Sequence, residues 1–85
     1  MPVKPSKKIQ VRYFALLREE RGLGEETVKT SAASVGELYV FLQKKYGLSL
    51  KPGVLKVAVN GEFKSWESCL ADGDSVVFIP PVAGG

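Results

Sequence analysis

The last six residues of the chain, PPVAGG, end in the group that is the strongest candidate for a chemical reaction. Gly85 ends the sequence, and a terminal glycine leaves its α-carboxylate uncrowded by any side chain. A carboxylate is a poor electrophile at neutral pH, and the chain has nothing with which to activate it. An external enzyme would have to do so, for example by adenylation. We therefore expect a carrier or a modifier that is passed between partners, with Gly84 and Gly85 at its reactive end.

The residues before the two glycines favour a thin, extended tail. Pro80 and Pro81 remove backbone donors, which ends a preceding strand and imposes an extended exit. Val82 and Ala83 add little bulk, and residues 76–85 carry no charge. Extended chain of this length spans at most about 20 Å, enough to enter a narrow channel in another protein. The alternative is a disordered end that merely finishes in glycines, since chain ends are often disordered and rich in small residues. Against it, the tail directly follows a predicted central strand and has no charge to keep an idle end solvated.

The side chains of the sequence provide no strong candidate for a catalytic or metal-binding group. The sequence has no histidine and a single cysteine, Cys69, so the commonest general base is missing and no internal disulfide can form. Because Cys69 has no histidine and no obvious cationic residue near it in the sequence to activate it, we interpret it as a small buried hydrophobic residue and not as a nucleophile. Asp72 and Asp74 flank a turn glycine and are interpreted as turn formers, so no metal site is expected.

Composition and charge narrow the class of protein. A hydrophobic content of 45% with 25% charged residues is typical of one soluble globular domain of this length. The longest apolar run, 76–79, is too short for a membrane span, and no signal peptide is recognisable, which favours a cytoplasmic location without membrane contact. The net charge of +3 comes largely from a basic N-terminus, without a basic stripe interleaved with aromatics. Nucleic-acid binding is therefore not expected.

The pattern of the first thirty residues predicts a leader followed by two strands. Residues 1–7 contain two prolines and no periodicity and are predicted to be disordered. Residues 8–14 alternate, with Ile9, Val11 and Tyr13 directed to the core and Phe14 on the polar side. Residues 15–22 form a helical turn, and residues 26–31 form a second strand.

Residues 34–47 contain the clearest helix. Ser34 and Glu37 have the spacing of a capping box, and Gly47 supplies a left-handed stop. We expect one buried stripe on this helix, made of Val35, Leu38, Phe41 and Leu42.

The second half of the chain predicts three more strands. Residues 54–60 and 62–66 flank Asn60 and Gly61, a pair typical of a type I′ hairpin turn. Residues 75–79 are apolar on both faces, as in a central strand. The order strand, strand, helix, strand, strand, strand predicts an α+β domain of two layers, with one main helix on one face of the sheet. Residues 8–79 would form this domain, and residues 80–85 a flexible tail.

These residues together resemble a known family. Its features are the FAxLRE segment from Phe14 to Glu19, the VNG turn at residues 59–61 and the segment LADGDSVVFIPPVAGG at residues 70–85. The combination closely resembles the small subunit of molybdopterin synthase, a sulfur carrier of the MoaD and ThiS type. The resemblance extends over residues 8–85, nearly the whole chain.

The resemblance implies a β-grasp, ubiquitin-like fold with a mixed sheet of about five strands. It further implies that an E1-like adenylyltransferase/sulfurtransferase, using ATP and Mg²⁺, adenylates Gly85 and converts it to a thiocarboxylate. That group would then donate sulfur to cyclic pyranopterin monophosphate in molybdenum cofactor biosynthesis. The chain itself would bind no cofactor. The catalytic side chains would belong to the synthase large subunit, with which this family forms a heterotetramer.

By the same resemblance, partner contacts come from Phe14, Arg18 and Ile79, where other members often carry an aromatic instead of Ile79. The tail residues Pro80, Pro81, Val82 and Ala83 would enter the large subunit. Three alternatives stay open: a sulfur carrier of the thiamine pathway, which usually lacks the Pro-Pro step, a ubiquitin-like protein modifier of the Urm1 kind, and an inert interaction domain.

Overall fold

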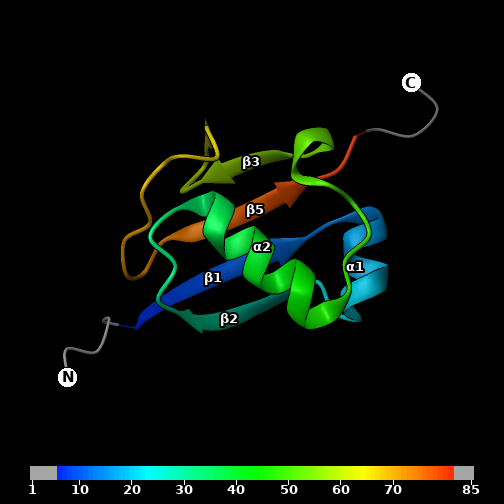
Figure 1. Ribbon diagram of the computed structural model, residues 1–85, viewed down its shortest axis with the longest axis horizontal. Helices are drawn as coiled ribbons and strands as arrows, with labels where there is room; N and C mark the ends of the chain where they lie inside the picture. The colour runs from blue at the N-terminus through cyan, green and yellow to red at the C-terminus, as the bar shows by residue number, and fades with distance from the viewer. Residues whose placement is uncertain (1–5, 82–85) are drawn as a thin grey trace.

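Five strands form one mixed sheet in the order β2-β1-β5-β3-β4 (Figure 1). The computed structural model describes residues 6–81. The strands are β1 (Lys7–Tyr13), β2 (Glu25–Thr30), β3 (Lys56–Val59), β4 (Glu62–Lys64) and β5 (Ser75–Ile79). β1 and β5 run parallel, and the other neighbours are antiparallel. The predicted central place of residues 75–79 is confirmed, because β5 lies between β1 and β3.

Two helices and a 3₁₀ turn complete the fold: α1 (Ala15–Arg21), α2 (Val35–Tyr46) and η1 (Pro52–Val54). α2 crosses one face of the sheet, and α1 lies at the end where β1 finishes (Figure 1). The predicted cap of α2 is present, since Ser34 Oγ accepts a hydrogen bond from the Glu37 amide at 3.2 Å. Neither helix of the described chain has the length and apolar character needed to cross a membrane.

The core lies between α2 and the sheet. Ile9, Val11 and Tyr13 are at most 1% exposed, so the alternation predicted for the first strand is confirmed. The buried face of α2 differs from the predicted stripe. Tyr39 is fully buried and Phe41 is 40% exposed. In a helix, residues 35, 38, 39 and 42 form one row, and Phe41 falls on the neighbouring row that faces outward.

An aromatic cluster joins α2, β5 and the loop after β4. The rings of Tyr39 and Phe78 meet edge to face with centroids 5.0 Å apart, and Trp66 stacks on Phe78 at 6.1 Å. Trp66 is therefore a packing residue. Aromatic pairs of this kind add about 0.5–1.5 kcal/mol beyond the burial of their area. The cluster holds β5 one residue before the strand ends.

The predicted turns are confirmed. Asn60 and Gly61 both have positive φ, at 52° and 85°, as a type I′ turn between β3 and β4 requires. Asp72 accepts a hydrogen bond from the Lys8 amide at 2.7 Å, and Asp74 accepts one from the Ala71 amide at 2.9 Å. Both carboxylates thus organise the turn before β5.

Two further predictions were wrong. The predicted leader extended to Lys7, but β1 already includes Lys7, which pairs with Thr30, while residues 1–5 fall outside the described part of the chain. Cys69, predicted to be buried, is exposed. An isolated bridge between Ser34 and Cys69 fixes the backbone there, and the alternation along it turns Leu70 inward and Cys69 outward.

Candidate functional site

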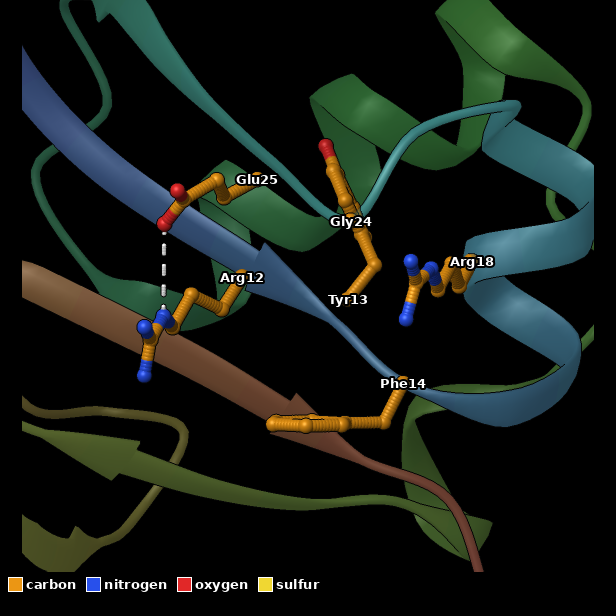
Figure 2. Close-up of a pocket in the computed structure, with 6 residues that line it drawn as sticks. All are labelled: Arg12, Tyr13, Phe14, Arg18, Gly24 and Glu25. Atoms are coloured by element: carbon orange, nitrogen blue, oxygen red, sulfur yellow. Dashed lines mark hydrogen bonds and ion pairs between the residues drawn. The ribbon is translucent and has the colours of Figure 1, made fainter.

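The parallel pairing of β1 and β5 defines the edge of the domain from which the tail leaves. The last registered pair joins Tyr13 to Phe78. Because parallel strands run in the same direction, Phe14 and Ile79, the next residue of each strand, emerge at the same end of the sheet. Figure 2 shows the Phe14 ring extending from the end of β1 toward β5. An exposed aromatic side chain therefore accompanies the base of the tail.

The turn into α1 fixes the position of Phe14. Phe14 is the N-cap residue of α1 with an extended backbone, and Ala15 follows with φ 51°. A left-handed conformation at a residue other than glycine costs about 1–2 kcal/mol, so the rest of the fold imposes this abrupt turn. The turn leaves the Phe14 side chain 46% exposed and outside the core.

Arg18 lies beside Phe14 on α1. Together with Arg12, Glu25 and Gly24 these residues line a shallow cavity of about 420 Å³ (Figure 2). Arg12 forms an ion pair with Glu25 at 3.4 Å, whereas Arg18 has no ion pair with any residue from 6 to 81. The Arg18 guanidinium packs closely on Gly24, where an added Cβ would lie 3.3 Å from Arg18 Nε. The cavity is thus lined by an exposed ring and by a guanidinium that forms no ion pair within residues 6–81.

The face of the sheet that α2 does not cover carries a row of apolar side chains. The strand register places Phe63 opposite Ala58 and Ala58 opposite Val77. Ile79 lies two residues after Val77 and therefore faces the same side. Phe63 is the most exposed of the row, at 71%. We call Phe14, Ala58, Phe63, Val77 and Ile79 the apolar strip.

The tail base itself is described as far as Pro81. Ile79 pairs with Lys56, and β5 ends there. Pro80 and Pro81 continue from it and, with Val54 of η1 and the Lys56 side chain, enclose a small cavity of about 250 Å³. The base of the tail therefore lies near η1 and the start of β3, with Pro81 exposed. The predictions for Val82, Ala83, Gly84 and Gly85 fall outside the described residues.

A polar network ties α1 to the rest of the domain. Glu26 of β2 accepts two hydrogen bonds from Arg21 at 2.7 and 2.8 Å and one from the Tyr13 hydroxyl at 2.6 Å. The Arg21 guanidinium also lies 3.6 Å from the centre of the Tyr46 ring, a cation–π contact with the end of α2. The network joins both helices to β1 and β2, and α1 carries Arg18.

The charges of this network stabilise one another. Hydrogen bonds from Arg21, aided by the one from Tyr13, lower the pKa of Glu26 although partial burial opposes the shift. Hydrogen bonding to Glu26 correspondingly raises the pKa of Arg21. Burial, together with the hydrogen bond to Glu26, raises the pKa of Tyr13 far above its usual range. Glu26 and Arg21 therefore stay ionised, and Tyr13 stays neutral, at physiological pH.

Comparison with known proteins identifies the family. The model described as "ThiS family" matches residues 11–85. The chain belongs to the ThiS family. A curated relative, the molybdopterin synthase sulfur carrier subunit of Escherichia coli (strain K12), is 36% identical over 80 residues, 91% of this chain and 99% of the relative. The protein of the same name from Mycobacterium tuberculosis is 38% identical over 81 residues, covering 92% and 98%.

Solved structures agree with this family. The small archaeal modifier protein 1 of Methanosarcina acetivorans has a TM-score of 0.77 and 25% identity, covering 95% of this chain and 99% of that one. A chain in the complex of subunits 1 and 2 of the molybdopterin-converting factor from Helicobacter pylori 26695 matches with a TM-score of 0.63 and 32% identity. The match covers 92% of this chain and 99% of that one. The predicted β-grasp, ubiquitin-like fold is confirmed, and so is the homology to molybdopterin synthase sulfur carrier subunits.

In this ThiS-family chain the structure brings five of the predicted site residues to one edge: Phe14, Arg18, Ile79, Pro80 and Pro81. Their partner-binding roles stay predictions. Sequence reasoning missed Phe63 and Ala58, although their positions on either side of the Asn60-Gly61 turn already implied that they pair. It also missed the Glu26 network, because no local pattern predicts that Arg21 and Tyr13 converge on that carboxylate.

Proposed function

We propose that this ThiS-family chain is the sulfur-carrying small subunit of a molybdopterin synthase and that the main-chain carboxyl of Gly85 carries the sulfur. Its homology to sulfur carrier subunits over nearly the full length supports this function. One observation carries the structural part of the argument. The uncharged tail leaves a central strand beside the exposed Phe14 ring, and Phe14 lines a cavity with Arg18, which makes no ion pair within residues 6–81.

The chemistry uses the tail alone. In the activating enzyme, one oxygen of the Gly85 carboxylate attacks the α-phosphorus of ATP, and pyrophosphate leaves with its Mg²⁺. Sulfide then displaces AMP from the acyl-adenylate, which gives the thiocarboxylate, AMP and a proton. On the synthase, the thiocarboxylate sulfur attacks an electrophilic carbon of cyclic pyranopterin monophosphate, and water hydrolyses the resulting thioester, which leaves the sulfur on the pterin and restores the carboxylate. ATP and Mg²⁺ belong to the activating enzyme, and the role of this chain is to position an unhindered carboxyl group.

The proposed partners bind where the tail begins. A large synthase subunit would cover the apolar strip, with Phe14 as an aromatic anchor and Arg18 as a charged contact at its margin. The Helicobacter pylori protein pair, titled a complex of subunits 1 and 2, supports such an assembly. We propose a heterotetramer of two small subunits on a large-subunit dimer, and a cytoplasmic location where ATP supports the activation.

The direct test is reconstitution. The chain is prepared with a thiocarboxylate at Gly85, mixed with a large subunit and cyclic pyranopterin monophosphate, and molybdopterin formation is followed. The matched control is the same chain with an ordinary carboxylate. We expect product only from the thiocarboxylate form, together with return of the chain to the carboxylate mass. A folded complex that forms no product from the thiocarboxylate would refute the proposal.

A second candidate function is protein modification, which the match to small archaeal modifier protein 1 favours. The same activated glycine would then form an isopeptide bond with a lysine of a target. Incubating the chain with its activating enzyme and a cell extract separates the two functions. Higher-mass conjugates that disappear on deletion of Gly84 and Gly85 would support modification.

A further inference from the structure

The outward row of α2 forms a shallow apolar groove that the proposed function does not use. Glu37, Val40, Phe41 and Lys44 follow the spacing of one helix face, and both apolar residues are 40% exposed. Pro52 and Trp66 border them, and the groove has a volume of about 610 Å³. We call these six residues the helix groove. Val40 and Phe41 together give this helix face an apolar centre that no other described residue covers fully.

The helix groove and the apolar strip lie on opposite sides of the domain. α2 covers one face of the sheet, with the core residues Val76 and Phe78 of β5 directed toward it. Val77 and Ile79 alternate with them and face the other side. A partner on the apolar strip therefore leaves the helix groove accessible, and the two surfaces can be occupied together.

The charges of the groove are arranged symmetrically about its apolar centre. Glu37 lies three residues before Val40, and Lys44 lies three residues after Phe41. Within residues 6–81 neither Glu37 nor Lys44 has an ion-pair partner. A purely acidic or purely basic ligand would meet one like charge in this arrangement. A second copy of α2, placed antiparallel, meets an opposite charge at both ends.

We infer that the helix groove is a self-association surface on which a second copy of the chain docks with α2 antiparallel to α2. A two-fold axis between Val40 and Phe41 brings each Glu37 against Lys44 of the second copy. The same axis stacks the two pairs of apolar side chains at the centre. Such an interface is isologous, so each contact occurs twice. This inference does not depend on the chemistry of Gly85.

The size of the surface implies a weak dimer. One helix face with Pro52 and Trp66 offers less than the roughly 800 Å² per partner that stable protein interfaces bury. The dimer should therefore form reversibly and increase with concentration. A weak contact of this kind can bring two carriers together without preventing either tail from entering a partner.

Variants of the full chain in which the charge of Glu37 or Lys44 is reversed test the inference. Sedimentation equilibrium over a range of concentrations measures the dimer dissociation constant of each. Glu37→Lys places lysine against lysine twice per dimer, and Lys44→Glu places glutamate against glutamate twice. Exposed ion pairs contribute about 0.2–1 kcal/mol each, so converting two attractions into two repulsions should raise the dimer dissociation constant about tenfold. An equimolar mixture of the two variants restores opposite charges at both ends and should dimerise as well as the unaltered chain.

The mixture also separates association from folding. Glu37 lies in the first turn of α2, and any loss of helix stability in Glu37→Lys is intramolecular, so mixing cannot repair it. Lys29→Glu and Glu62→Lys, which alter exposed residues outside the groove by the same charge, are the matched controls and should leave association unchanged. A chain that stays monomeric at every concentration, or a mixture that associates no better than either variant alone, overturns the inference.

Discussion

Tyr13 of β1 and Phe78 of β5 are direct partners in the parallel part of the sheet, and both are buried. One residue later, the two strands release Phe14 and Ile79 at the same edge. The buried pair therefore sets the separation between the aromatic ring that is proposed to dock and the tail that is proposed to react. In this fold, positioning of the reactive end is a property of strand register.

Phe14→Ala should weaken binding of the large subunit. Truncation of an aromatic anchor at the centre of an interface costs about 2 kcal/mol or more, so the dissociation constant should rise at least about tenfold. Calorimetry with the carboxylate form of the chain measures it. Leu16→Ala, two residues along and of similar exposure, is the control and should have little effect. Equal losses from both substitutions would contradict the assignment of Phe14 as an anchor.

Arg18→Ala should reduce partner affinity without reducing stability. Arg18 is exposed and makes no ion pair among the residues that the structure describes, so its loss should change the free energy of unfolding by less than about 0.5 kcal/mol. If Arg18 contacts a carboxylate of the partner, the association rate should fall and its dependence on salt should decrease. Lys29→Ala, which removes one positive charge from β2, is the matched control. Identical salt dependence in the two variants would exclude a role for Arg18 in docking.

Glu26→Gln should destabilise the domain at neutral pH. It removes the anion that Arg21 and Tyr13 contact, and loss of one partner in a largely buried charged network costs about 1–3 kcal/mol. Urea unfolding at pH 7 measures the loss. Glu19→Gln, on the exposed side of α1, is the matched control.

The same variant should show a changed dependence of stability on pH. The folded-state pKa of Glu26 is lowered, so its contribution is present above the unfolded pKa of about 4.3 and disappears as the pH falls through the folded value. Stability of the unaltered chain should therefore fall more steeply below about pH 4 than that of Glu26→Gln. Parallel acid profiles would show that Glu26 is not the group responsible.

The sequence was most informative where the pattern is local. Alternation placed Phe14 outside the core, Ser34 and Gly47 bounded α2, and Asn60 with Gly61 predicted the hairpin turn that the structure contains. Each of these signals depends on a few neighbouring residues and on backbone preferences that hold in most contexts.

The features that the sequence did not predict depend on contacts between residues far apart in the chain. No periodicity indicates that β1 is parallel to β5, so the proximity of Phe14 to the tail followed from the family resemblance and from the structure. Cys69 was wrongly expected to be buried because its small, apolar character outweighed the unseen bridge to Ser34. Phe41 was wrongly included in the buried row because Tyr39, with a polar hydroxyl, occupies the core and satisfies that hydroxyl on the Leu50 carbonyl at 2.6 Å.

The central claim is that the main-chain carboxyl of Gly85, and no side chain, carries the sulfur. The most direct measurement adds one alanine after Gly85, incubates the variant and the unaltered chain with the activating enzyme, ATP and a sulfur donor, and follows the intact mass of each. We predict that the unaltered chain exchanges one oxygen for sulfur at its terminus and supports molybdopterin formation, whereas the extended chain does neither. Full sulfur delivery by the extended chain, with its added alanine still in place, would contradict the claim.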